Sequence, residues 1–167
     1  KITDVAATCA IAREKGAVAV VDNTFASPYL QRPLALGADL VLYSTTKYLG
    51  GHAALVGGAV VTNRADLAER LADLQNALGG VPSPFDSWLV LRGTKTLAAR
   101  MDVHCENAEA LAEWLVSRKD VRRVHYPGLP GHPQHAVAAR QMKRFGGMIS
   151  FELEGDLTEL FWHRERV

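Results

Sequence analysis

The 167-residue sequence has little of what marks several large classes of protein. It holds two cysteines, 7% aromatic residues and a formal net charge of +1, with lysine and arginine spread along the chain. This balance gives no electrostatic basis for binding nucleic acid or an acidic membrane surface. No apolar run is long enough to span a bilayer, and no segment has the pattern of a secretory signal. We therefore expect a cytoplasmic protein whose partners include neither nucleic acid nor membrane.

The two cysteines, Cys9 and Cys105, are far apart and lack the spacing of a zinc site or a redox pair. Both lie in helical patterns, where small buried thiols are common. We expect two reduced core residues rather than a disulfide.

The sequence also lacks an initiator methionine and an opening strand, because Lys1 leads directly into a helical pattern. We expect the chain to be an excerpt from a longer protein. Its composition, 48% hydrophobic and 22% charged, is typical of a globular protein. Its length suits one domain, or one domain and part of a second.

The residues that are present alternate between helical and strand patterns. Predicted helices cover residues 2–15, 65–78, 85–117 with a pause at Gly93, and 134–144, and predicted strands cover residues 17–21, 39–43, 59–62, 121–126 and 148–153. Thr3 or Asp4 is expected to cap the first helix, and Asn63 the second. The element order changes after about residue 106, which predicts a domain boundary between residues 1–105 and 106–167.

Two of the predicted strands end in groups that can do chemistry. The runs 17–21 and 40–43 are apolar without alternation, which indicates strands buried on both faces of a parallel sheet. The first ends in Asp22 and the second in Ser44-Thr45-Thr46-Lys47. Ligands of open parallel sheets bind beyond the carboxyl ends of the strands. The pattern predicts a cofactor site at this edge.

A lysine whose amine has lost its proton can form a Schiff base with an aldehyde cofactor such as pyridoxal phosphate. That cofactor also needs a carboxylate for its ring nitrogen and donors for its phosphate. Asp22 can supply the first, and Ser44 and Thr46 the second. The residues alone leave a simpler reading open, in which Lys47 is a solvated loop residue and Asp22 caps a turn. A nucleotide-binding domain is a third reading, although no phosphate-binding glycine spacing precedes Lys47.

The motifs around these residues resemble a known family. The run VVDNTFASPYLQRPLALGADLVLYSTTKYLGGH is similar to the Cys/Met-metabolism family of pyridoxal-phosphate enzymes. The segments PSPFDSWLVLRGTKTLAARMDVHCENA, VHYPGLPGHPQHAVAARQM and RFGGMISFEL resemble later parts of the same proteins. The likeness covers residues 2–153 and is strongest to the branch of cystathionine γ-synthase and cystathionine γ-lyase.

The resemblance implies an α/β fold of the aspartate-aminotransferase type, fold type I. Residues 1–105 would be the C-terminal part of the large domain that binds pyridoxal phosphate. Residues 106–167 would begin the smaller C-terminal α/β domain. The implied assembly is a homotetramer, a dimer of dimers, with active sites at dimer interfaces.

The same resemblance implies a role for each site residue. Lys47 would be the Schiff-base lysine and the carrier of protons between substrate carbons and leaving group. Asp22 would pair with the ring nitrogen, and Ser44 and Thr46 would help hold the phosphate. The implied reaction is trans-sulfuration at a γ-carbon, by a cystathionine γ-synthase or γ-lyase. The implied substrates are amino acids: cystathionine, O-acylhomoserine and cysteine.

The chain also departs from the family pattern. The resemblance implies that the ring-stacking tyrosine, the glycine loop and the carboxylate-binding arginine lie outside these 167 residues. His52 is followed by Ala53 and Ala54, where many relatives have Ser-Asp. The ending, residues 154–167, does not follow the family. These departures keep an alternative open: an inactive truncated fragment or interaction module that retains the fold core without a complete active site.

Overall fold

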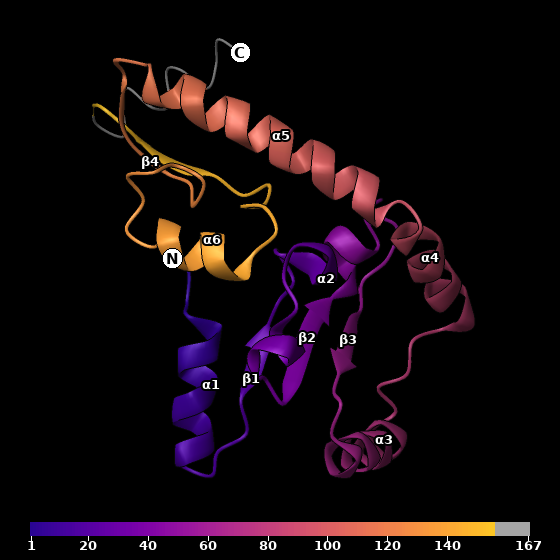
Figure 1. The fold of residues 1–167 in the computed structure, drawn as a ribbon. Coiled ribbons are helices and arrows are strands. Elements are labelled where there is room, and N and C mark those ends of the chain that lie inside the picture. Colours follow the sequence, from indigo (N-terminus) through magenta and orange to yellow (C-terminus); the bar gives the residue numbers. More distant parts are fainter. Residues whose placement is uncertain (156–167) are drawn as a thin grey trace.

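The computed structural model describes residues 1–155 (Figure 1). Its elements, in chain order, are α1 (Val5–Glu14), β1 (Val20–Asp22), α2 (Ser27–Leu30), the 3-10 turn η1 (Pro33–Leu36), β2 (Leu40–Ser44), the π-helical turn η2 (Thr45–Leu49), β3 (Gly58–Val61), α3 (Ala65–Leu78), α4 (Pro84–Thr94), α5 (Leu97–Val116), β4 (Val121–His125), α6 (His135–Gln141) and β5 (Ser150–Leu153). Residues 156–167, nearly all of the ending predicted to depart from the family pattern, lie outside the described residues.

A three-stranded sheet with the order β1-β2-β3 forms the first half of the molecule. β1 and β2 are parallel, as predicted, with Val20 opposite Leu40, whereas β3 runs antiparallel to β2. Helix α1 lies beside this sheet in Figure 1 and buries Val5 and Cys9 against Val41. The parallel pair brings the carboxyl ends of β1 and β2 to one edge.

The prediction that these strands are buried on both faces is wrong for this structure. β2 alternates instead, with Val41 buried and Leu42 exposed. Val20, Leu42 and Val60 are 51%, 37% and 48% exposed. The reason is that α1 and its neighbours cover only one face, while the face carrying these three side chains stays open among residues 1–155.

The predicted side-chain cap is present at the N-terminus of α1 but not at that of α3. Asp4 caps α1, because its carboxylate accepts a hydrogen bond from the backbone N–H of Ala7 at 3.1 Å. The prediction that Asn63 caps α3 is wrong. Arg64 occupies the cap position without a side-chain cap bond, and its own N–H donates to the Thr62 hydroxyl at 3.0 Å.

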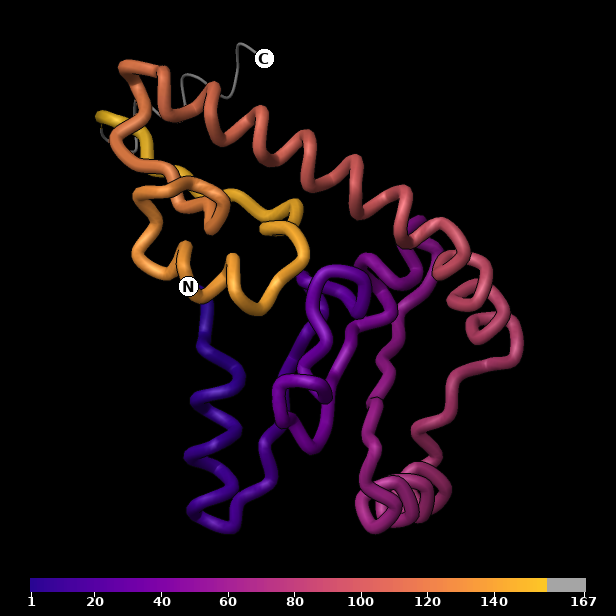
Figure 2. Tube along the Cα trace, in the orientation of Figure 1, coloured from indigo at the N-terminus to yellow at the C-terminus, as the bar shows by residue number. Residues whose placement is uncertain are grey.

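Helix α5 crosses from the sheet to a second group of elements, as the chain trace shows (Figure 2). Its first half packs Leu97, Met101 and Cys105 against Leu30. Its second half buries Ala108 and Ala112 against Tyr126, beside the antiparallel β4–β5 pair. The predicted boundary at residue 106 thus falls inside one continuous helix, at the point where its packing partners change.

Both cysteines are free thiols in the interior, as predicted. Burial raises the pKa of the Cys9 thiol and of the Cys105 thiol. Within residues 1–155, no helix is both long and apolar enough to cross a membrane.

Met101 should carry much of the packing between α5 and α2. Its side chain is fully buried, so Met101→Ala should lower the free energy of unfolding by about 2–5 kcal/mol through lost apolar contact and a cavity. Met148 is 51% exposed, and Met148→Ala should change it by less than about 0.5 kcal/mol. Urea titration followed by circular dichroism measures both. Equal losses in the two variants would contradict this account of the core.

Candidate active site

Lys47 follows the end of β2 inside the turn η2. Its backbone, with φ −88° and ψ −128°, breaks the helical path of the turn. The side chain is exposed, and its Nζ lies 3.5 Å from the Ser44 hydroxyl, at the outer limit of a hydrogen bond. Residues 45–51, which carry this amine, are called the lysine segment below.

Asp22 and Ser44 project from the same face of the sheet. Asp22 lies opposite Leu42 in the parallel register, and Ser44 follows Leu42 by two residues. Thr24 connects the two strand ends. Its N–H donates to Asp22 Oδ1 at 3.0 Å, and its hydroxyl accepts from the Ser44 N–H at 2.8 Å. Asp22, Ser44 and Lys47 therefore lie along one open edge.

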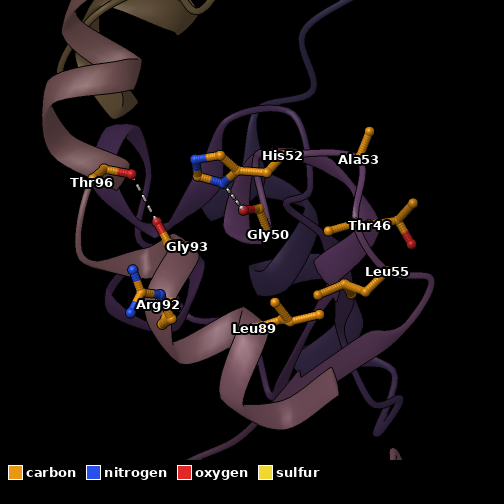
Figure 3. Close-up of a pocket in the computed structure, with 10 residues that line it drawn as sticks. Thr46, Gly50, His52, Ala53, Leu55, Leu89, Arg92, Gly93 and Thr96 are labelled. Atoms are coloured by element: carbon orange, nitrogen blue, oxygen red, sulfur yellow. Dashed lines mark hydrogen bonds between the residues drawn. The ribbon is translucent and has the colours of Figure 1, made fainter. Parts of the chain in front are cut away.

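Thr46 is placed differently. Its hydroxyl accepts a hydrogen bond from the Gly57 N–H at 3.0 Å, and the Thr45 N–H donates to the Gly57 carbonyl at 2.9 Å. These bonds tie the start of the lysine segment to the residue before β3. In this structure the Thr46 side chain lines a cavity of about 240 Å³ between this loop and α4 (Figure 3).

The loop after the lysine segment closes the same cavity. His52 makes one hydrogen bond among the described residues. Its Nδ1 lies 2.8 Å from the Gly50 carbonyl (Figure 3). Ala53 has a φ of +52°, a left-handed conformation that costs a residue with a Cβ atom about 1 kcal/mol. The Ala-Ala departure from the family pattern thus falls on a strained turn.

A buried amide network supports the loop that follows β1. The Asn23 side-chain nitrogen donates to the carbonyls of Ser27 at 3.0 Å and Gln31 at 2.9 Å, and its oxygen accepts from Gln31 Nε2 at 2.9 Å. The Asn23 nitrogen also lies 3.2 Å from the Tyr43 hydroxyl. Ser27 has a φ of +62°, and these bonds hold it there. The network fixes the backbone next to Asp22.

Tyr48 anchors the lysine segment from the other side of Lys47. Its ring lies 6.4 Å from the Phe25 ring, edge to face, and 5.1 Å from the His104 ring. Burial is the main cause of a raised pKa for the Tyr48 hydroxyl. The residue after the lysine is therefore held by aromatic packing.

The structure brings the predicted site residues together only in part. Lys47 and Ser44 are neighbours, and Asp22 reaches Ser44 through Thr24. Asp22 also lines a larger cavity of about 830 Å³ beside the outer edge of β1. Thr46 faces the smaller cavity instead. Sequence reasoning missed Thr24 and Asn23, although both directly follow Asp22 and carry the polar groups that such a strand end uses.

A family model for the Cys/Met metabolism PLP-dependent enzymes matches residues 1–165. The chain belongs to this family. Pyridoxal phosphate is the cofactor on which the family depends. The resemblance expected from the lysine motif and from the three later segments is confirmed. The prediction that residues 154–167 do not follow the family is wrong, because the match extends to residue 165.

Several proteins similar to this chain are named as cystathionine enzymes. It is 59% identical to a cystathionine β-lyase of Coxiella burnetii over 160 residues, which are 95% of this chain and 41% of the relative. It is 57% identical to a probable cystathionine γ-synthase of Herpetosiphon aurantiacus, covering 93% of this chain and 49% of the relative. The chain thus spans less than half the length of these curated relatives. The β-lyase is a branch that the sequence analysis did not name.

A solved structure confirms the fold class. The crystal structure of the cystathionine γ-synthase from Xanthomonas oryzae pv. oryzae, in complex with aminoacrylate and cysteine, superposes with a TM-score of 0.94 at 55% identity. The match covers 96% of this chain and 42% of that one. The α/β fold of this family, fold type I, is therefore the fold of these residues.

The Thr46 hydroxyl should stabilise the lysine segment through its bond to Gly57. Thr46→Val removes the acceptor of the Gly57 N–H and should lower the free energy of unfolding by about 1–2 kcal/mol. Thr46→Ser keeps the oxygen and should stay within about 0.5 kcal/mol of the wild type. Thermal and urea unfolding measure the difference. A Thr46→Ser variant as unstable as Thr46→Val would show that the methyl group matters instead.

Proposed function

We propose that this chain carries the cofactor-binding lysine of a pyridoxal-phosphate enzyme of trans-sulfuration, a cystathionine γ-synthase or γ-lyase. The observation that carries the proposal is the grouping of Lys47, Ser44 and Asp22 along one edge, at the ends of the parallel strands β1 and β2. Membership of the family, with cystathionine enzymes among the relatives, supports the same reaction class.

The donor set of this edge fits pyridoxal phosphate. Within residues 1–155, neither the Lys47 amine nor the Asp22 carboxylate takes part in an ion pair. The amine is thus available to the aldehyde, and the carboxylate to the ring nitrogen. Among residues 1–155 the Ser44 hydroxyl forms a hydrogen bond only with the lysine amine, at 3.5 Å, and it can donate to a phosphate oxygen. We also assign Thr46 to this phosphate. In this structure its side chain lines the smaller cavity and its hydroxyl accepts from the Gly57 N–H, so the role requires the hydroxyl to turn toward Ser44.

Each residue has a defined task in this proposal. When bound, the cofactor accepts the electron pair left behind when a proton leaves the substrate carbon. Lys47, freed by the incoming substrate amine, takes the proton from the α-carbon and returns it near the leaving group. Asp22 would hold a proton on the ring nitrogen by accepting its hydrogen bond. Ser44 orients the Lys47 amine, its neighbour at 3.5 Å.

Substrate, assembly and compartment complete the proposal. The substrates would be cystathionine, O-acylhomoserine and cysteine, and the relatives' names support cystathionine among them. We propose a homotetramer built as a dimer of dimers in the cytoplasm, with neither nucleic acid nor membrane as a partner. We also propose that residues 1–105 belong to the large domain and 106–167 to the smaller one. The change of packing partners along α5 supports that division.

The test is a lysine substitution in the natural full-length polypeptide that contains these residues. Lys47→Ala should abolish the visible absorption band of the bound cofactor and lower the turnover of cystathionine or O-acylhomoserine by at least about a thousandfold, because no other amine replaces it. Lys119→Ala, which removes an exposed lysine after α5, should change neither. Retention of the band and of turnover in Lys47→Ala would refute the assignment.

A second candidate is favoured by the open face of the sheet. Val20, Leu42 and Val60 are 37–51% exposed on the same face as Asp22 and Ser44, so this face of the sheet is only partly covered within residues 1–155. The 167-residue chain by itself would then be an inactive fragment or interaction module. We expect the isolated chain to show negligible cystathionine turnover, measured as released thiol or keto acid. Turnover within tenfold of the full-length polypeptide, or about 1.4 kcal/mol in barrier, would exclude this candidate.

A further inference from the structure

Arg100 contacts the lysine segment through the Tyr48 carbonyl, and none of the predicted roles uses it. It sits in the first turn of α5. Its guanidinium donates three hydrogen bonds: to the Tyr48 carbonyl at 2.8 Å, to the Gly93 carbonyl at 2.8 Å and to the Thr96 hydroxyl at 2.9 Å. One side chain thereby joins the lysine segment, the last turn of α4 and the start of α5.

The positively charged Arg100 side chain donates its hydrogen bonds to neutral acceptors. Within residues 1–155 no carboxylate forms an ion pair with it. Partial burial lowers the pKa of its guanidinium. Gly93 belongs to the last turn of α4, whose carbonyls carry partial negative charge, so a cation there is favourable. The Gly93 carbonyl also accepts from the Thr96 N–H at 3.3 Å and from the Thr96 hydroxyl at 3.2 Å. An arginine fork can serve several acceptors at once, and a lysine ammonium cannot match that geometry.

Glycines allow α4 and Arg100 to approach the lysine segment this closely. A Cβ atom on Gly93 would collide with the Gly50 carbonyl and would lie 2.7 Å from the Leu49 carbonyl. A Cβ atom on Gly51, whose φ is +71°, would collide with the Arg100 guanidinium. The backbone of α4 at Gly93 therefore packs directly against the backbone of the lysine segment at Leu49 and Gly50, and Arg100 lies next to this contact at Gly51.

The bond to Tyr48 matters because Tyr48 directly follows Lys47. The Tyr48 ring is packed between Phe25 and His104, and Arg100 fixes its carbonyl. On the other side of Lys47, Thr45 and Thr46 are tied to Gly57. The kinked backbone of Lys47 is thus held from both sides, and Arg100 supplies the only charged group among these ties.

We propose that Arg100 is a positioning residue for Lys47: its hydrogen bond to the Tyr48 carbonyl sets the direction in which the lysine amine leaves the backbone. The inference rests on the proposed function, because it assigns the amine the task of holding pyridoxal phosphate. It requires two effects of losing the guanidinium. The lysine segment should open more often, and Lys47 should hold the cofactor less well.

The experiment compares Arg100→Gln and Arg100→Lys with Arg144→Gln in the natural full-length polypeptide. Arg144 is a matched control, because it also makes several hydrogen bonds, to the Asp102 carbonyl, Glu106 and Glu109, but none to the lysine segment. Two quantities are measured. One is the rate of backbone hydrogen exchange in the peptide covering residues 44–51, measured without cofactor. The other is the pyridoxal phosphate concentration that half-saturates Lys47, trapped with borohydride and read by mass spectrometry.

Arg100→Gln should raise both quantities by about tenfold, as expected for the loss of one hydrogen bond from a charged donor. Arg144→Gln should leave both within about twofold while lowering the thermal midpoint through the loss of its own bonds. Arg100→Lys keeps the charge and most of the packing, and should shift both quantities in the same direction by less. This variant keeps the test decisive if Arg100→Gln does not fold.

Three results would overturn the inference. The first is exchange of residues 44–51 that is unchanged in both Arg100 variants. The second is faster exchange with unchanged half-saturation of Lys47. The third is a rise in both quantities as large in Arg144→Gln as in Arg100→Gln. Failure of the proposed function has a different signature, namely no trapped cofactor on Lys47 in the wild type.

Discussion

The parallel pairing of β1 with β2 is the constraint on which the chemistry of this chain depends. Its register places Asp22 opposite Leu42 and leaves Ser44 two residues farther along the same face. The pairing continues past the strand ends, since the Asn23 N–H donates to the Leu42 carbonyl at 2.9 Å and the Ser44 N–H to the Thr24 hydroxyl at 2.8 Å. A slip of one residue would turn Asp22 or Ser44 to the opposite face.

Buried polar groups hold that register more firmly than three short strands could. Asn23 and Gln31 exchange hydrogen bonds in the interior and satisfy the carbonyls of a loop that contains the left-handed Ser27. In an interior that excludes water, an unpaired amide costs about 1–3 kcal/mol, so each bond of the network favours one backbone path. These bonds hold the loop after β1 in one conformation, which fixes the backbone next to Asp22.

Much of this arrangement could be predicted from local sequence, and the part that could not is long-range. The apolar runs that end in Asp22 and Lys47 indicated the strand ends, because strand pattern and strand-end chemistry are both local signals. The burial of those runs on both faces was predicted wrongly, since an apolar pattern does not say what covers it. The roles of Asp22, Ser44, Thr46 and Lys47 stay predictions.

The spacing of residues in the sequence did not predict the contacts that join the lysine segment to α4 and α5. Arg100 is 52 residues from Tyr48, and a lone arginine in a helical pattern normally indicates a solvated face. Gly93 indicated only a pause between helices, whereas in the structure its missing side chain admits the Gly50 carbonyl. A contact of this kind depends on where α4 and α5 fold back on the sheet, and single-residue patterns do not contain that information.

Helix α5 packs against both halves of the molecule. Its first turn holds the lysine segment through Arg100, and its second turn contacts α2, where Asp102 accepts a hydrogen bond from the Tyr29 hydroxyl at 2.9 Å. Lys143, from the second half, donates to the same hydroxyl at 2.6 Å. One unbroken helix therefore joins these contacts to the packing around Tyr126 in the second half of the molecule.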